Sequence, residues 1–90
     1  FLTGTDEHGQ KIEQAAQKFH FPSAQAFTDK ISQNFKNLNT VLHISNDDFI
    51  RTTEERHKNY VLKIWKKLVD SGNIYLSEYK GWYSVRDEAF

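Results

Sequence analysis

The 90-residue sequence contains no cysteine and no methionine, one proline and four glycines, and its acidic and basic residues cancel to a net charge of zero. Without cysteine the chain forms no disulfide and no thiolate metal site. No apolar run approaches the roughly 20 residues that a membrane-spanning helix needs. Zero net charge argues against a domain that mainly coats nucleic acid, because that affinity grows with the number of neutralised phosphates.

What the sequence does contain is typical of a soluble globular domain. Hydrophobic residues make up 38% of the chain, aromatic residues 14% and charged residues 27%. A chain of this length folds as one small domain and buries roughly 60–65% of its unfolded surface. Because even the initiator methionine is absent, we interpret the chain as an internal piece of a larger protein.

The first ten residues carry the strongest indication of a site. A short apolar run ends at Gly4, acidic residues, an imidazole and a glycine follow, and a helical pattern then begins near Asp6 or Glu7. This is the pattern of a strand over residues 1–5 and a strand-to-helix turn at the carboxyl edge of an α/β sheet, where small molecules bind. The remaining strands of that sheet are expected upstream.

Three helices are predicted downstream, each from apolar residues at helical spacing. The first has Ile12, Ala15, Ala16 and Phe19 on one face and ends before Pro22; Ser23 is a good N-cap for the next. The second spans residues 24–42, with a stripe formed by Phe27, Ile31, Phe35, Leu38 and Leu42. The third runs to Asp70 with an apolar face formed by His57, Val61, Ile64, Trp65 and Leu68.

The ends of the third helix have recognisable signals. Thr52 and Glu55 form a predicted capping box, and Gly72 is the expected left-handed residue after the last turn. Beyond it, residues 74–79 and 82–85 alternate like strands, so we predict a β hairpin there. The predicted fold is mainly α: three amphipathic helices in a small bundle with short flanking β segments.

Several charged residues have a structural and a functional interpretation. For Arg51 an ion pair with Asp47 or Asp48 is favoured over a functional contact with phosphate. The lysines of the third helix are interpreted as a solvated face. The four histidines lack ligand spacing, so no metal is assigned. No nucleophile–base pair is recognisable either, and no catalytic residue is assigned.

Three motifs in order resemble methionyl-tRNA synthetases across essentially all 90 residues. They are Phe-Leu-Thr-Gly-Thr-Asp-Glu-His-Gly-Gln-Lys at 1–11, Phe-Ile-Arg-Thr-Thr at 49–53, and Gly-Asn-Ile-Tyr…Glu-Tyr-Lys-Gly-Trp-Tyr at 72–83. The resemblance implies a class I Rossmann-type α/β parent that contains residues 1–9 as the last strand and active-site turn of its split catalytic domain. Residues 10–72 would then be a three-helix segment, and residues 73–90 the start of the connective insertion.

The resemblance also implies an activity and a site. Such enzymes activate methionine with ATP and Mg²⁺ to methionyl-adenylate and transfer the methionyl group to tRNA. Asp6 matches the residue that contacts the methionine ammonium, and His8 and Gly9 line the same turn. From the residues alone, Asp6 also suits an N-cap or first-turn acid. The structural alternative for His8 is packing against the sheet edge. For Gly9 it is close packing of the helix on the strand.

One departure from the family pattern concerns zinc. Many relatives carry Cys-Val-x-Cys where this sequence has Ser84-Val85-Arg86-Asp87. Serine and aspartate do not replace two thiolates in a tetrahedral zinc site, so the chain resembles the zinc-free branch.

The remaining expectations concern activity, location and rivals. The 90 residues alone are expected to be inactive as a ligase and to bind no cofactor. A cytoplasmic location is expected, with mitochondria as the alternative, no membrane partner, and self-association through exposed edge segments. The competing hypotheses are a leucyl, isoleucyl or valyl class I synthetase, and a free-standing helical interaction module.

Overall fold

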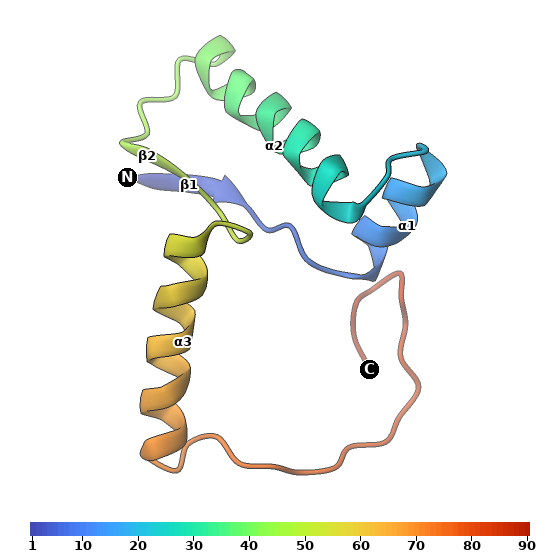
Figure 1. The fold of residues 1–90 in the computed structure, drawn as a ribbon, viewed down its shortest axis with the longest axis vertical. Helices are drawn as coiled ribbons and strands as arrows, with labels where there is room; N and C mark the ends of the chain where they lie inside the picture. Colours follow the sequence, from blue (N-terminus) through green and yellow to red (C-terminus); the bar gives the residue numbers. More distant parts are fainter.

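The computed structural model describes all of residues 1–90 and contains two short strands and three helices (Figure 1). In chain order they are β1 (Leu2–Thr5), α1 (Gln10–Lys18), α2 (Ala24–Val41), β2 (Asp48–Arg51) and α3 (Glu55–Asp70). The expected strand at the start of the chain and the three expected helices are therefore present. No helix combines the length and the apolar character that crossing a membrane requires.

The two strands pair in parallel, with Leu2 opposite Asp48 and Thr5 opposite Arg51. Parallel strands need a crossover connection, and α1 and α2 supply it. Glycine is required at position 4 because an added Cβ would lie 1.9 Å from the backbone oxygen of Ile50. The parallel register places the ends of both strands at the same edge of the sheet, and the candidate site lies there.

The small core lies between α1, α2 and β1. Ala16 and Phe27 are buried, and the Phe27 ring stacks on Phe19 and meets Phe21 edge-on at 5.3 Å between ring centroids. Ser23 caps α2 as predicted, because its hydroxyl accepts a hydrogen bond from the Ala26 amide at 3.0 Å. The second half of the predicted α2 stripe is exposed, with Phe35, Leu38 and Leu42 between 45% and 59% accessible.

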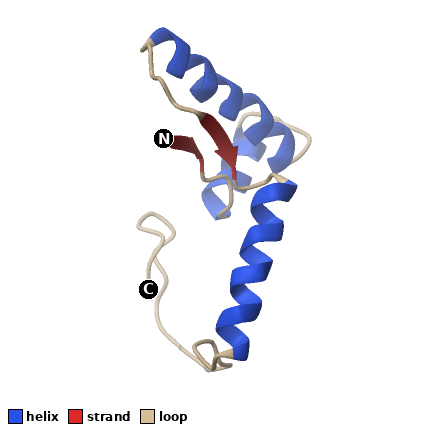
Figure 2. Ribbon diagram, turned by 90° about the vertical axis from the view of Figure 1, so that its left-hand side faces the viewer, coloured by secondary structure: helices blue, strands red, loops and turns tan.

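The predicted three-helix bundle is wrong, because α3 does not join α1 and α2. It leaves the sheet edge and extends away from the other helices (Figures 1 and 2), and none of its residues is buried. Its start is fixed by the contacts of the turn after β2, which direct it away from the α1–α2 pair. Amphipathic spacing therefore predicted the helix α3 and its apolar side, but it gave no information about which part of the protein packs against that side.

The predicted C-terminal hairpin is also not formed. Residues 74–80 contain no strand, and one isolated antiparallel bridge joins Ser84 to Ala89. A lone hairpin is marginal without further strands, and here Trp82 remains 97% exposed. The segment returns toward α1 (Figure 1), where Lys11 Nζ lies 3.6 Å from Glu88 Oε1. The division of the chain into domains remains a prediction.

Helix α1 begins at Gln10, later than the predicted start at Asp6 or Glu7. Gly9 has φ +132°, which L side chains rarely adopt, and it separates the turn from the helix. Gly72, with φ +75°, follows the C-cap Ser71 of α3, as the sequence predicted.

Candidate functional site

The candidate site is formed by two turns, residues 6–9 after β1 and residues 52–54 after β2. Their backbones are joined directly: the Thr52 amide donates a hydrogen bond to the Thr5 carbonyl oxygen at 3.2 Å. The Glu7 amide in turn donates to the Thr52 hydroxyl oxygen at 2.9 Å. These two bonds hold Thr5 and Glu7, the residues on either side of Asp6, against the second turn.

The carboxylate of Glu7 is the most buried charged group of the turn, with a side-chain exposure of 4%. Arg51 donates to both of its oxygens, from Nε to Oε2 and from Nη2 to Oε1, each at 2.8 Å. The hydroxyl groups of Thr5 and Thr53 donate to the same carboxylate at 2.5 and 3.1 Å. Burial alone would raise the pKa of Glu7, but the bonds from Arg51, Thr5 and Thr53 outweigh it and lower that pKa below its ordinary value.

Arg51 also reaches helix α2, because its Nη2 donates to Asp29 Oδ1 at 2.7 Å. This bond, together with one from Gln25, lowers the pKa of Asp29, while Glu7 and Asp29 raise the pKa of Arg51. The favoured interpretation of Arg51 as an ion pair with Asp47 or Asp48 is therefore wrong in its partners. Asp48 pairs with Arg56 instead, and Asp47 pairs with the N-terminal amine.

The predicted capping box at the start of α3 is wrong as well. Glu54 is the N-cap residue, without a side-chain cap bond, and its Oε1 accepts from the Arg51 amide at 3.0 Å. Thr52 uses its hydroxyl oxygen for the Glu7 amide across the two turns. A tertiary contact to the first turn thus replaces the local bond that the sequence pattern favours.

Asp6 differs from its neighbours in having a free carboxylate. It is exposed and makes no hydrogen bond or ion pair within the chain. It lies at the border of a hollow of about 100 Å³ between the first turn and α2. The other lining residues are Thr5, Glu7, Ile12, Phe27, Thr28, Ile31, Ser32 and Phe35. Asp6 is thus a residue with a free carboxylate that borders a largely apolar hollow.

His8 and Gly9 lie on the other side of the turn. The His8 ring is exposed, with Nε2 3.4 Å from the carbonyl oxygen of Thr52, and it borders a shallow groove shared with His57, Val61 and Leu62. An added Cβ at Gly9 would meet nothing closer than Glu88 Oε1 at 3.9 Å. Glycine is required at position 9 by its φ rather than by a close neighbour.

The sequence-based prediction did not identify Glu7 and Asp29 as site residues. Nothing local in the sequence distinguishes Glu7 from Asp6, and Asp29 lies 22 residues from Arg51. The only available signal was Arg51, which directly precedes the second turn. Had parallel pairing of residues 1–5 with 49–51 been predicted, Arg51 would have been placed beside the first turn.

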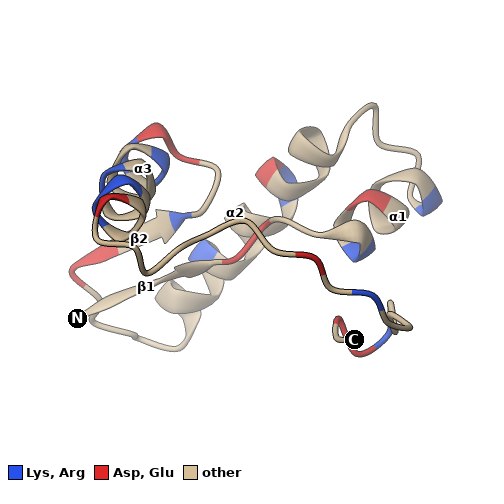
Figure 3. Cartoon of the chain, turned by 90° about the horizontal axis from the view of Figure 1, so that it is seen from below, with Lys and Arg blue, Asp and Glu red and all other residues tan.

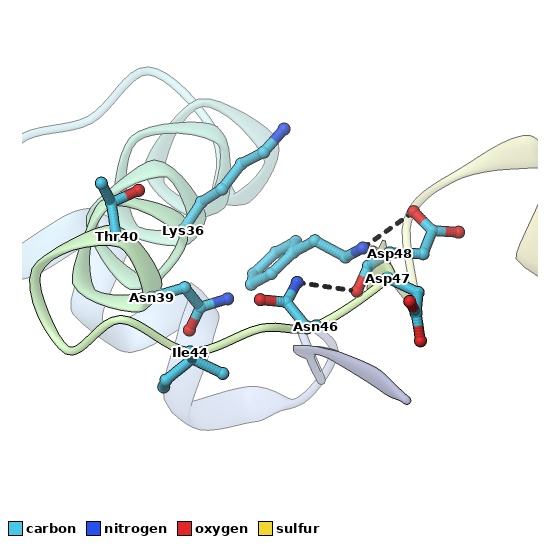
Figure 4. A pocket seen from close by; sticks show the side chains of 8 residues that line it. Lys36, Asn39, Thr40, Ile44, Asn46, Asp47 and Asp48 are labelled. Atoms are coloured by element: carbon cyan, nitrogen blue, oxygen red, sulfur yellow. Dashed lines mark hydrogen bonds between the residues drawn. The ribbon is translucent and has the colours of Figure 1, made fainter.

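A second hollow, of about 340 Å³, lies at the opposite end of the sheet, where β2 begins (Figure 4). Polar side chains line it, among them Lys36, Asn39 and Asp48, and it shares no lining residue with the two turns.

Charged residues are spread over the molecule, and α3 carries five of the basic ones (Figure 3). No group of three or more His, Asp or Glu side chains is placed to hold a metal ion.

Comparison with known proteins gives matches over nearly the whole chain. The family described as tRNA synthetases class I (M) matches residues 1–90. The methionine–tRNA ligases of Rickettsia bellii and Bacillus subtilis are 63% and 53% identical over all 90 residues. A crystal structure of Mycobacterium tuberculosis methionyl-tRNA synthetase bound by methionyl-adenylate superposes with a TM-score of 0.89 at 45% identity, covering 97% of this chain and 17% of that one. The chain spans 18% of the R. bellii ligase and 13% of the B. subtilis ligase.

Proposed function

The chain belongs to the class I tRNA synthetases of the methionyl type, and from this membership we propose that its 90 residues work within an enzyme that activates methionine with ATP and transfers it to tRNA. The match to that family across residues 1–90 favours this function over a leucyl, isoleucyl or valyl synthetase. The separate position of α3 argues against a free-standing helical bundle.

In this proposal Asp6 binds the α-ammonium group of methionine. The observation that carries the assignment is the free carboxylate of Asp6, a residue that borders an apolar-walled hollow and lies between two residues tied to the second turn. A carboxylate and an ammonium group form a charge-assisted hydrogen bond, roughly twice as strong as a neutral one. Of the two acids in the turn, Asp6 alone has a carboxylate without a partner in the chain.

The chemistry follows from holding the amino acid at its ammonium end. The methionine carboxylate is the nucleophile that attacks the α-phosphorus of ATP, forming methionyl-adenylate with loss of pyrophosphate. Catalysis of this step relies on positioning and electrostatics, so a fixed ammonium contact lowers the barrier by orienting the carboxylate. His8 and Gly9 contribute to the same turn, Gly9 through its backbone conformation.

ATP and Mg²⁺ are proposed for the whole enzyme. The donor groups of these 90 residues do not fit a metal ion, because no three ligating side chains converge. We therefore assign neither the metal nor the nucleotide to a residue of this segment, and the 90 residues alone are expected not to catalyse the ligation.

The wider setting of the segment is proposed on the same basis. The paired strands β1 and β2 would belong to a larger parallel sheet of Rossmann type, since two parallel strands alone are too few to form an independent sheet. Translation takes place in the cytoplasm, which is the proposed location, with mitochondria as the alternative. In isolation, the unpaired outer edges of β1 and β2 would allow two copies to associate.

Asp6→Asn in the full-length protein tests the assignment. Methionine-dependent ATP–pyrophosphate exchange should show a methionine KM raised about tenfold or more, because the variant lacks the carboxylate charge that pairs with the ammonium group. Asp70→Asn is the matched control, since Asp70 is an exposed acid in the last turn of α3. A normal methionine KM in Asp6→Asn would contradict the proposal.

A further inference from the structure

Two adjacent acids follow β1, and the structure treats them in opposite ways. Glu7 is buried and receives four side-chain hydrogen bonds, two of them from Arg51. Asp6 is exposed and receives none. A cationic ligand that approaches the turn therefore meets one free carboxylate beside one that is already neutralised. Without Arg51 the turn would present two competing anions.

We propose that Arg51, bound in bidentate fashion to Glu7 and singly to Asp29, is a positioning residue that leaves Asp6 as the sole carboxylate for the methionine ammonium; this rests on the function proposed above. Arg51 does not bond the free Asp6 carboxylate itself, since the hydrogen bonds of its side chain go to Glu7 and Asp29. It acts on Asp6 indirectly, through the neighbouring residue Glu7.

The geometry of the pair requires arginine. Nε and Nη2 of Arg51 each lie 2.8 Å from a different oxygen of Glu7, which fixes the plane of the carboxylate. The same Nη2 lies 2.7 Å from Asp29 on α2, so the turn is held relative to the wall of the hollow. A lysine supplies one point charge without this planar fork. It would keep the charge near Glu7 but lose the fixed orientation.

The pair therefore has two separable effects on the neighbouring residue. Neutralising Glu7 directs the ammonium to Asp6, and tying Glu7 to α2 and to the second turn fixes where the Asp6 carboxylate lies. Both effects concern recognition of the ammonium group. Neither concerns the nucleotide, so methionine binding and ATP binding should respond differently when the pair is changed.

Arg51→Lys and Glu7→Gln in the full-length enzyme test the proposal. ATP–pyrophosphate exchange would give KM for methionine, KM for ATP and kcat, with active-site titration to count folded sites. A second measurement would compare methionine with the analogue that carries hydrogen in place of the α-amino group, used as a competitive inhibitor. The ratio of the two affinities reports the contribution of the ammonium contact alone.

Both variants are expected to raise the methionine KM about tenfold, to leave the ATP KM within about twofold, and to lower the ammonium-dependent affinity ratio about tenfold. Arg56→Lys is the matched control, because Arg56 is an exposed arginine of the same segment whose partners are Asp48, Glu54 and the Phe49 carbonyl. It should leave all of these values unchanged.

An unchanged ratio in folded Arg51→Lys and Glu7→Gln would overturn the proposal, as would an equal effect of Arg56→Lys. Loss of active sites without a change in methionine KM, or failure of both variants to fold, would assign the pair to folding alone and overturn it as well. These outcomes are distinct from failure of the proposed function, which would appear as absent methionine-dependent exchange in the wild-type enzyme.

Discussion

At the scale of single residues, the buried charge of Glu7 is stabilised because both of its carboxylate oxygens accept hydrogen bonds. Removing a carboxylate from water costs several kcal/mol unless donors replace the lost hydration. Here Arg51, Thr5 and Thr53 provide four donors, and the amide of Glu7 is also bonded. These donors stabilise the ionised form of Glu7, so the stability of the turn should depend on pH.

The ordinary pKa of Glu7 is 4.5, and its pKa in the folded chain lies lower. A lowered folded pKa contributes stability that is present above the unfolded value and lost as the pH falls through the folded value. Asp29, whose pKa is lowered first by its bond from Arg51, acts in the same direction. Hydrogen-exchange protection of residues 5–9 in the full-length protein, corrected for intrinsic rates, should be constant above about pH 5 and fall at lower pH.

Glu7→Gln should reduce this protection about tenfold or more at neutral pH and largely flatten its pH dependence, because a hydrogen bond to a charged group contributes about 1.5–3 kcal/mol. Glu55→Gln is the control, since Glu55 has an 80% exposed side chain with one 3.5 Å contact to Lys58. The same steep loss of protection at low pH in Glu7→Gln would show that another group controls the turn.

At the scale of secondary-structure elements, the close approach of β1 to β2 can be tested at Gly4. An alanine Cβ would lie 1.9 Å from Ile50 O and 2.8 Å from Ile50 C, both rigid backbone atoms. The strands would have to separate, so Gly4→Ala should cost about 1–3 kcal/mol or more. Because β1 and β2 carry the two turns, methionine-dependent exchange by the full-length enzyme should fall with it.

The matched glycine is Gly81, where the nearest atom to an added Cβ is a Tyr79 side-chain carbon at 3.2 Å, which can move. Gly81→Ala should therefore leave activity nearly unchanged. Equal activity of Gly4→Ala and the wild type would mean that the strands tolerate a wider spacing than the structure has.

The elements show which structural information is local in a sequence. Helix α2 and its cap at Ser23 were predictable because helical spacing and the N-cap bond involve residues within a few positions of each other. The partners of Arg51 were not predictable in that way, because Glu7 and Asp29 lie 44 and 22 residues away. The capping box failed for the same reason: Thr52 is bonded to Glu7, 45 residues away.

The candidate site likewise has a part that was predictable from local sequence and a part that was not. The turn that contains Asp6, His8 and Gly9 was recognisable from its composition, and its likeness to a family gave Asp6 a role that remains a proposal. The network that supports Asp6 depends on parallel pairing of β1 with β2. No local pattern records that pairing, because each strand is only four residues long.

At the scale of the whole molecule, these 90 residues are extended. The radius of gyration is 16.6 Å and the extents are 44 × 33 × 23 Å, whereas a compact chain of this length has a radius of gyration of about 12 Å. Five of 90 residues are buried. The apolar face of α3 is largely open, with Ile64 and Trp65 about half exposed at 47% and 56%. Most of the stabilising burial that a domain of this size needs is therefore missing from the chain itself.

This shape predicts unequal stability within the isolated 90-residue chain. Helix α3 has 16 residues and buries none of them, and isolated helices of about this length are marginal in water. Helix α2 packs against α1 and β1 and buries Phe27, Thr28 and Ser32. Amide exchange followed by NMR should therefore show α3 amides exchanging at nearly unprotected rates and the first half of α2 protected. Circular dichroism should show a broad thermal transition.

In the full-length enzyme, where we propose that further parts of the protein contact α3, its amides should become protected. Equal protection of α2 and α3 together with one sharp transition in the isolated chain would contradict this prediction, because it would require α3 to pack against α1 and α2 after all.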